Sequence, residues 1–133
     1  MTFLVDTSVL IAYSDQRDER HADAAGLLRR ALEDREFGNG YISDFIIDEV
    51  LTLAYARSRD KSRTVQLGEF LFTEFEFVHT SPEIFKKSWE LFQKSTGLSF
   101  TDCTLVVLMK TFGIQSLLSF DSGFDQTDIH RMG

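Results

Sequence analysis

Short apolar runs alternate along this chain with longer stretches of helical spacing. The run Phe3-Leu4-Val5 ends at Asp6, and the apolar residues 9–13 that follow fit a brief helix. After the turn signal Gly38-Asn39-Gly40, the residues Tyr41-Ile42-Ser43 predict a second strand. Two further strands are predicted at residues 75–79, where the alternation is weak, and 116–120.

Helix-start and helix-stop signals divide the rest of the chain. Asp44 and Asp60 stand as candidate N-caps. Ser81 followed by Pro82 opens another helix, because proline fits the first helical position. Gly113 ends the last one. The predicted helices cover about residues 18–34, 44–59, 60–72, a stretch from 82 onward, and 99 or 101 to 112.

This alternation of strands and helices predicts an α/β domain with a largely parallel central sheet and helices on both faces. Such sheets bind ligands beyond the carboxyl ends of their strands, near the point where the strand order reverses. Asp6 and Asp121 both directly follow predicted strands. The pattern therefore indicates a site at this end of the sheet.

Composition adds limits to this picture. With 133 residues, 43% of them hydrophobic, the chain suits one domain over residues 1–133 with a real core. The N-terminus carries no basic leader, and no apolar stretch approaches the roughly 18 residues of a membrane span, so we expect a cytoplasmic protein without a membrane segment. The single cysteine, Cys103, excludes an internal disulfide and a cysteine-rich zinc site, and its apolar neighbours place it in the core.

The net charge of −7 counts against a generic nucleic-acid-binding module. It does not exclude a nuclease, because clustered carboxylates that hold divalent cations are themselves negative, and the cations reverse the local field. The placement of the acids is therefore more informative than their number.

Several acids stand at strand ends or on apolar flanks. Asp6 and Asp121 follow strands, where each could also serve as the cap of the next helix. Glu49 lies on a helix flank with Phe45 one turn before it and Leu53 one turn after it. A charge in such a place needs a salt bridge, a shifted pKa or a cation.

Asp102 supports two interpretations equally. Ser99 and Asp102 have the spacing of a capping box, which is a structural role. Leu105 and Val106 lie three and four residues further on, so Asp102 also points along the buried side of its helix. The residues alone leave both interpretations open.

Four acids on four separate elements are hard to explain as unrelated caps. Carboxylates that meet repel one another, so they must take up protons or bind cations. Hard oxygen ligands favour Mg²⁺ or Mn²⁺ over zinc. The histidines lie in a charged segment, at a strand end and in the tail, and we expect all of them to be structural or solvated: His21, His79 and His130.

Sequence blocks in a fixed order resemble the PIN-domain ribonucleases, and in size the chain is similar to VapC-type toxins. The blocks are residues 3–11, Ser43 with Glu49, residues 100–102 and residues 118–124. The resemblance spans nearly the whole chain. It implies a three-layer α/β/α fold with a central, mostly parallel sheet, and metal-dependent cleavage of RNA by the toxin of a toxin–antitoxin pair.

The family's acidic set falls on Asp6, Glu49, Asp102 and Asp121, with Asp125 as a candidate fifth acid. We expect the three aspartates Asp6, Asp102 and Asp121 to hold one Mg²⁺ or Mn²⁺ ion. Glu49 would contact that ion or orient the attacking water. Three polar residues would support the site: Thr7, Ser8 and Ser119. The family's usual last strand is expected to be reduced to residues 128–130.

The resemblance also implies an RNA substrate, a homodimer and a protein antitoxin that blocks the site. A basic cluster past the Glu49 helix is a candidate set of RNA phosphate contacts, although a solvated turn explains it equally well: Arg57, Arg59, Lys61 and Arg63. An apolar stripe could supply a partner surface, although such a stripe more often belongs to the core: Phe70, Leu71, Phe72 and Phe75.

Two other functions compete with this one. A phosphatase of the haloacid dehalogenase type also begins with an Asp after an apolar strand, but it normally needs a second acid two positions on, where this chain has Ser8. A catalytically silent PIN-like scaffold would bind RNA or protein without cutting. Such a scaffold would be expected to lose an acid, and this chain keeps the whole set.

Overall fold

A parallel sheet forms the centre of the molecule. The computed structural model describes residues 1–133, with the strands β1 (Thr2–Val5), β2 (Asn39–Ser43), β3 (Glu76–Val78), β4 (Ser116–Leu118) and β5 (His130–Met132). They lie in the order β3-β2-β1-β4-β5, and every pairing is parallel. β1 is therefore the central strand, with β2 on one side and β4 on the other.

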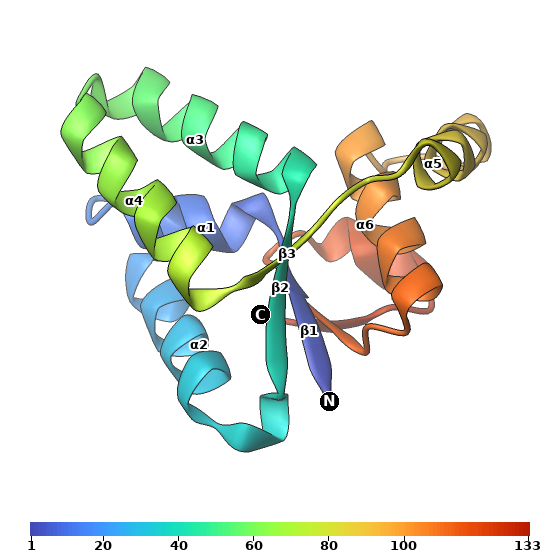
Figure 1. The fold of residues 1–133 in the computed structure, drawn as a ribbon, viewed down its shortest axis with the longest axis horizontal. Helices are drawn as coiled ribbons and strands as arrows, with labels where there is room; N and C mark the ends of the chain where they lie inside the picture. Colours follow the sequence, from blue (N-terminus) through green and yellow to red (C-terminus); the bar gives the residue numbers. More distant parts are fainter.

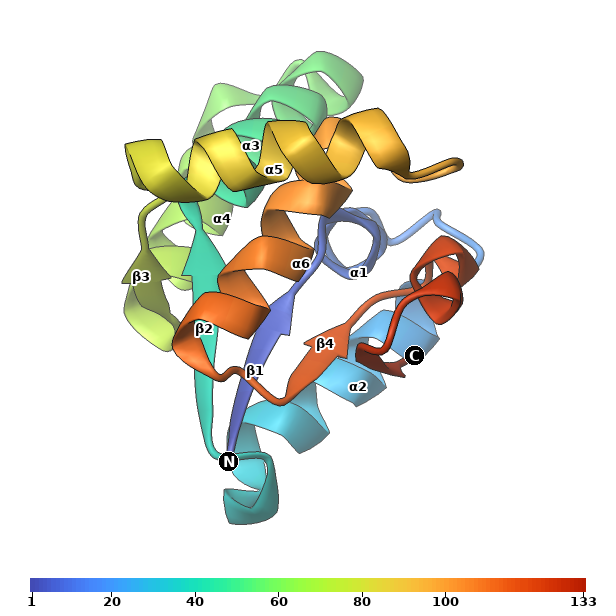
Figure 2. The same ribbon diagram turned by 90° about the vertical axis from the view of Figure 1, so that its right-hand side faces the viewer.

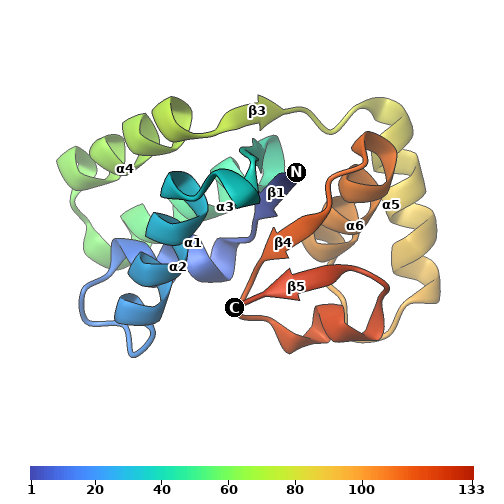
Figure 3. The ribbon, with the colours of Figure 1, turned by 90° about the horizontal axis from the view of Figure 1, so that it is seen from below.

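Helices cover both faces of this sheet. They are α1 (Thr7–Ser14), α2 (His21–Glu33), α3 (Asp44–Ser58), α4 (Lys61–Glu74), α5 (Pro82–Lys94) and α6 (Phe100–Phe112). Figures 1 and 3 show α1 to α4 on one face of the sheet and α5 and α6 on the other. The predicted three-layer α/β/α arrangement is confirmed. No helix has both the length and the apolar character needed to cross a bilayer.

Most helix ends form where the local signals predicted them. Asp60 accepts a hydrogen bond from the Arg63 amide at the start of α4. Ser99 and Asp102 form a reciprocal capping box at the start of α6. Gly113, with φ of 66°, ends α6 in the left-handed conformation that glycine adopts without strain.

The start of α3 differs from the prediction. Its N-cap is Ser43, whose hydroxyl accepts a hydrogen bond from the Ile46 amide at 3.2 Å, and Asp44 is already helical. The reason is that an N-cap needs extended backbone, which the last residue of β2 supplies with φ of −93° and ψ of 160°. The Asp44 carboxylate instead accepts hydrogen bonds from Thr80, at 3.0 Å from its amide and 2.7 Å from its hydroxyl.

Other boundaries move by a few residues. α2 begins at His21 rather than near residue 18, because the preceding residues form a turn held by Asp18, which accepts the Arg20 amide at 2.8 Å. β3 and β4 are shorter than predicted, and β5 lies at residues 130–132 instead of 128–130.

The core lies on both sides of the central strands. Phe3, Leu4 and Val5 of β1 are at most 1% exposed, as a strand covered on both faces should be. Leu117 and Leu118 of β4 are equally buried. The apolar side of α6 packs here too, and Cys103 lies in this core as predicted.

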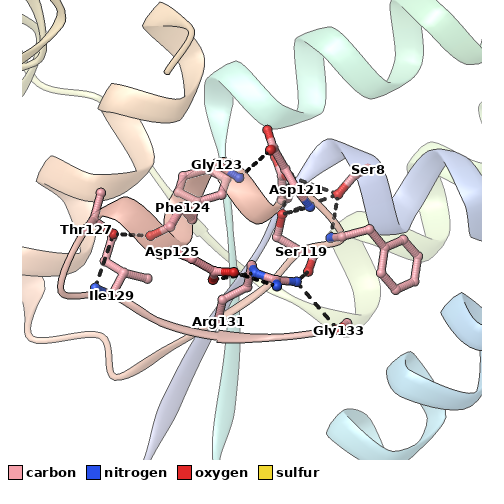
Figure 4. A network of polar contacts seen from close by, with 12 residues as sticks. Ser8, Ser119, Asp121, Gly123, Phe124, Asp125, Thr127, Ile129, Arg131 and Gly133 are labelled. Atoms are coloured by element: carbon pink, nitrogen blue, oxygen red, sulfur yellow. Dashed lines mark hydrogen bonds and ion pairs between the residues drawn. The ribbon is translucent and has the colours of Figure 1, made fainter. Parts of the chain in front are cut away.

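An ion pair clamps the edge strand β5. Arg131 donates to both carboxylate oxygens of Asp125, at 2.8 and 3.0 Å, and also to the carbonyl of Ser119 at 3.0 Å (Figure 4). Bidentate contacts of this kind fix the orientation of a guanidinium as well as its position. The clamp therefore ties the end of the chain to the residue that follows β4.

Candidate active site

Two neighbouring strands are followed by acids at the same edge of the sheet. β1 and β4 are parallel partners that lie side by side in Figure 2. Asp6 follows β1, and its amide donates to the Leu118 carbonyl at the end of β4 at 2.9 Å. Asp121 follows β4 after two further residues. The strand order reverses at β1, which is where open parallel sheets bind their ligands.

The Asp6 side chain is buried and fully engaged. It is 5% exposed. Its Oδ1 accepts the Thr7 amide at 2.8 Å, and its Oδ2 accepts the hydroxyls of Ser119 at 2.7 Å and Ser8 at 2.9 Å. The two serine hydroxyls also lie 3.4 Å apart, and Figure 4 shows them side by side. Three donors from two elements thus hold this carboxylate in one orientation.

Burial raises the pKa of Asp6 above its ordinary value. The hydrogen bonds from Ser119 and Ser8 act in the opposite direction, and the negative charge of Asp102 raises the pKa further. The surroundings of Asp6 therefore disfavour its ionised form. A cation placed beside it would stabilise that form.

Asp102 caps α6 and is also half-buried near other acids. Its Oδ2 accepts the Ser99 amide at 3.0 Å, which completes the capping box. Burial raises its pKa, hydrogen bonds from Ser99 oppose that rise, and the charges of Asp121 and Glu49 add to it. Asp102 therefore lies within electrostatic range of each of the other three acids, and the structure brings Asp6, Glu49, Asp102 and Asp121 to one region.

Asp121 and Glu49 are less constrained than Asp6. Asp121 is exposed, and its Oδ1 accepts the Gly123 amide at 2.8 Å as the cap of a short 3₁₀ turn, Ser122–Gln126. Glu49 is half-buried on α3 and forms no ion pair. Phe45 and Leu53, one turn before and after it, are half-buried, whereas Asp48 and Thr52 are exposed, so Glu49 lies on an apolar flank of α3 as predicted.

The acids have the chemistry of a metal site without its final geometry. No three acidic, histidine or cysteine side chains stand close enough together to hold an ion. Asp102 and Asp121 are turned to backbone amides beside them. The donors are all oxygens, which suits Mg²⁺ or Mn²⁺. The buried hydroxyl of Thr7, next to Asp6, has no hydrogen-bond partner, and buried hydroxyls normally have one. The residues present therefore fit a hard divalent cation.

The candidate fifth acid has another partner. The Asp125 carboxylate is engaged by Arg131, which lowers the pKa of Asp125 through hydrogen bonding and charge. Sequence reasoning did not find Arg131, because it lies in a short tail with no periodic pattern. Only its pairing across the 3₁₀ turn shows what it does.

The basic cluster does not form one surface. Arg57 and Arg63 line a cavity between α1, α3 and α4. Arg59 and Lys61 line a separate groove between α3 and α4, where the Lys61 ammonium lies 4.2 Å from the centre of the Tyr55 ring. Residues that are close in sequence thus diverge in space.

The predicted histidine roles agree with the contacts. His21 lies 3.0 Å from the Ala12 carbonyl, and His130 lies 3.1 Å from the Ser116 hydroxyl. His79 packs edge-on against Phe77 with ring centres 4.4 Å apart. None of these rings reaches the acids.

Comparison with known proteins finds relatives of the VapC type. A VapC ribonuclease from Archaeoglobus fulgidus is 27% identical over 139 aligned positions, which cover 98% of this chain and 84% of that protein. The crystal structure of VapC20 from Mycobacterium tuberculosis, described as a sarcin-ricin loop cleaving toxin, superposes with a TM-score of 0.83 at 24% identity, covering 96% of this chain and 95% of that one.

A toxin–antitoxin complex from Klebsiella pneumoniae superposes with a TM-score of 0.71 at 20% identity, covering 98% of this chain and 95% of that one. These structures share the fold described above. The profile of the PIN domain family matches residues 3–129. Because this match spans nearly the whole chain, the protein belongs to the PIN domain family.

Proposed function

We propose that this chain, as a single domain, is a Mg²⁺- or Mn²⁺-dependent ribonuclease and the toxin of a toxin–antitoxin pair. The observation that carries the proposal is the group of four acids at this edge of the sheet, in which Asp6 is buried and Asp102 lies within electrostatic range of the other three. The relative from Archaeoglobus fulgidus is named as a ribonuclease, and VapC20 is described as a toxin that cleaves the sarcin-ricin loop. An RNA substrate also supports the expected cytoplasmic location.

In this proposal Asp6, Asp102 and Asp121 hold the cation. When bound, the metal lowers the pKa of a coordinated water and neutralises negative charge on the phosphate. Asp102 and Asp121 would exchange their backbone partners for the ion. Asp6 is already oriented by Ser8 and Ser119, so it needs no rearrangement.

Glu49 is the base in this proposal. It forms no ion pair, so its carboxylate oxygen is available to accept a proton from the attacking water. The water oxygen forms a bond to phosphorus while the bond from phosphorus to the leaving ribose oxygen breaks, and that oxygen takes up a proton from solvent. Ser8 and Ser119 then keep Asp6 in place during the reaction.

We propose a homodimer as well, but on a different surface from the predicted stripe. Leu71 and Phe75 of that stripe are buried, Phe70 is half-buried, and only Phe72 is well exposed, so the stripe is mostly core. A cluster of contacting aromatic rings lies instead on α5 and the adjoining helix starts, with Phe85, Trp89 and Phe92 exposed and Phe45 and Phe100 half-buried.

Phe85 and Trp89 are each 50% exposed and Phe92 is 39% exposed, which is typical of a surface that a partner covers. Replacing Trp89 with Glu should convert the dimer to a monomer in analytical ultracentrifugation. A protein antitoxin is the second proposed partner, supported by the toxin–antitoxin complex among the similar structures.

The direct test is RNA cleavage by the purified chain. RNAs including a sarcin-ricin stem-loop and a scrambled loop would be incubated with Mg²⁺, with Mn²⁺ or with chelator. We expect cleavage that needs the metal. Cleavage that continues unchanged in chelator contradicts the mechanism, and binding without any cleavage supports the scaffold alternative.

A further inference from the structure

A cavity of about 920 Å³ lies at the far ends of α1 and α3, away from the four acids. The start of α2 and the start of α4 complete its wall. Figure 1 shows these ends together at the left of the molecule. We call it the arginine pocket after the residues that define it here: Tyr13, Arg17, His21, Arg57, Arg63 and Phe70.

The arginine pocket has an excess of positive charge, because three arginines and two aspartates line it. Asp15 lies within electrostatic range of Arg57, and both aspartates also accept local hydrogen bonds. Asp15 accepts the Arg17 amide at 2.9 Å and its Nε at 3.3 Å, and Asp60 accepts the Arg63 amide at 3.1 Å. The guanidinium groups of Arg57 and Arg63 form no ion pair. In a chain with a net charge of −7, two such arginines in one cavity favour an anionic ligand.

Flat rings and a free hydroxyl line the same cavity. The Tyr13 ring stacks at 5.2 Å from Phe70 and at 6.4 Å from His21, measured between ring centres. Because the Ala12 carbonyl can only accept, Nδ1 of His21 carries the proton, and the ring is held in place. The Tyr13 hydroxyl is left to donate to a ligand. Cationic forks, a hydroxyl donor and aromatic surfaces are the groups that bind a nucleotide's phosphate and base.

Two helices connect the arginine pocket to the acids. α1 begins beside Asp6 and ends at the pocket, and α3 carries both Glu49 and Arg57. The seven residues from Asp6 to Tyr13 and the eight from Glu49 to Arg57 each span about 10–12 Å at 1.5 Å per residue. α1 and α3 pack against each other, so both paths run side by side. A single RNA strand can bridge this distance within a few nucleotides.

We propose that the arginine pocket binds a backbone phosphate of the RNA substrate, together with its nucleotide, a few positions from the bond that is cut. The proposal rests on the proposed ribonuclease function and deepens it. Arg57 and Arg63 make the contact. Arg59 and Lys61, which line the separate groove between α3 and α4, take no part in it.

The test compares two double variants that remove the same charge. Arg57→Gln with Arg63→Gln removes two of the three arginine charges that line the pocket, and Arg29→Gln with Arg30→Gln removes two exposed arginines on α2 outside it. RNAs of increasing length are cleaved with Mn²⁺. For long RNA we expect the pocket variant to raise KM by about tenfold, with the loss in KM rather than in kcat. In the pocket variant, the KM for long RNA should no longer be lower than the KM for short RNA, whereas the α2 variant behaves like the wild type.

Direct binding gives a second measurement. In an Asp6→Asn background, which prevents cleavage, RNA affinity is measured by fluorescence anisotropy at several salt concentrations. We expect the slope of log affinity against log salt to fall by about two in the pocket variant and not in the α2 variant. Equal slopes and equal KM values for the two variants overturn the proposal.

Other outcomes have separate meanings. If the pocket variant loses affinity for poly-glutamate but not for RNA, the pocket binds an acidic protein segment, and the proposal is overturned. If the wild type cleaves no RNA, the ribonuclease function fails, while the anisotropy measurement still decides whether the pocket binds RNA. If the wild type cleaves and the two variants do not differ, the pocket assignment alone fails.

Discussion

Asp6 and Asp121 follow neighbouring parallel strands, yet they differ in burial and in the number of hydrogen bonds that they accept. Asp6 is buried and receives three hydrogen bonds, two of them from serine hydroxyls. Asp121 is exposed and receives one, from the Gly123 amide. β1 is the central strand and runs directly into α1, whereas β4 is followed by an exposed turn. The comparison teaches that a strand end supplies the position of an acid, and burial decides how much its charge needs a counter-ion.

The largest expected difference is in RNA cleavage. Asp6→Asn should lower kcat by about a thousandfold or more, because a metal ligand supplies several kcal/mol of transition-state stabilisation. Asp121→Asn should lower it less, since an exposed ligand is more easily replaced by water. The measurement is single-turnover cleavage with saturating Mn²⁺. An Asp6→Asn variant as active as Asp121→Asn would remove the distinction between the two acids.

Metal-dependent stability sharpens the same comparison. At a metal concentration 100 times the Kd, binding adds about 2.7 kcal/mol to the free energy of unfolding. Wild-type protein should therefore melt at a higher temperature with Mn²⁺ than with chelator, and Asp6→Asn should lose this difference. Differential scanning fluorimetry measures it, with Ca²⁺ and Na⁺ at matched ionic strength as controls. Equal metal-induced shifts in both proteins would place the cation away from Asp6.

The serine that links the two strand ends comes next in size. Ser119 is fully buried, donates to Asp6 at 2.7 Å and accepts the Asp121 amide at 3.0 Å. Ser119→Ala leaves both groups short of a partner and should lower the free energy of unfolding by about 1–3 kcal/mol. Urea denaturation measures the loss, and Ser122→Ala in the exposed turn is the matched control. Identical midpoints for the two variants would show that the link contributes nothing.

The pH dependence of stability should reveal the burial of the Asp6 carboxylate. Burial raises the pKa of Asp6 above its ordinary value of 3.8, so the folded state binds this proton more tightly than the unfolded chain does. Without metal, stability is therefore lost as the pH rises from 3.8 through the raised folded pKa.

An Asp6→Asn variant cannot lose that proton. In chelator it should unfold at nearly the same temperature as the wild type well below pH 3.8 and at a higher temperature near pH 7. Melting curves at several pH values give the gap between the two proteins. A gap for Asp6→Asn that shrinks as the pH rises would contradict a raised pKa for Asp6 in the folded state.

The smallest effect is expected at Asp125. Its carboxylate is paired with Arg131, and surface substitutions usually change free energies by less than about 0.5 kcal/mol, or roughly a factor of two in rate. Asp125→Asn should therefore leave metal-dependent cleavage nearly unchanged. A loss as large as that of Asp121→Asn would make Asp125 a fifth member of the metal site.

Local signals explain why so much of the fold could be predicted. Caps such as Asp60 and Ser99 act within one helical turn, so a few residues specify them. The positions of Asp6 and Asp121 followed from the rule for parallel sheets. Partners distant in sequence could not be found in this way, and neither could the choice between Ser43 and Asp44 as the cap of α3, because it depends on where β2 ends.

Helix α5 shows most clearly what the sequence pattern could not predict. Its Ile84 and Ser88 are buried, while Phe85 and Trp89, one residue further on, are half exposed. Both pairs have helical spacing, and the sequence does not say which side another element will cover. The split of the basic cluster has the same cause, since Arg57 and Arg63 line one cavity beside α3 and α4 while Arg59 and Lys61 line another.

The bond between Ser119 and Asp6 joins residues that are 113 positions apart. Closing so long a loop is slow, and contacts of this kind form late in folding. During synthesis the N-terminal half emerges first. Asp6 therefore cannot form its hydrogen bond with Ser119 until β4 has been synthesised. Nascent chains that have not yet reached β4 therefore lack the proposed cutting site, so its assembly is delayed until β4 and Ser119 have been translated.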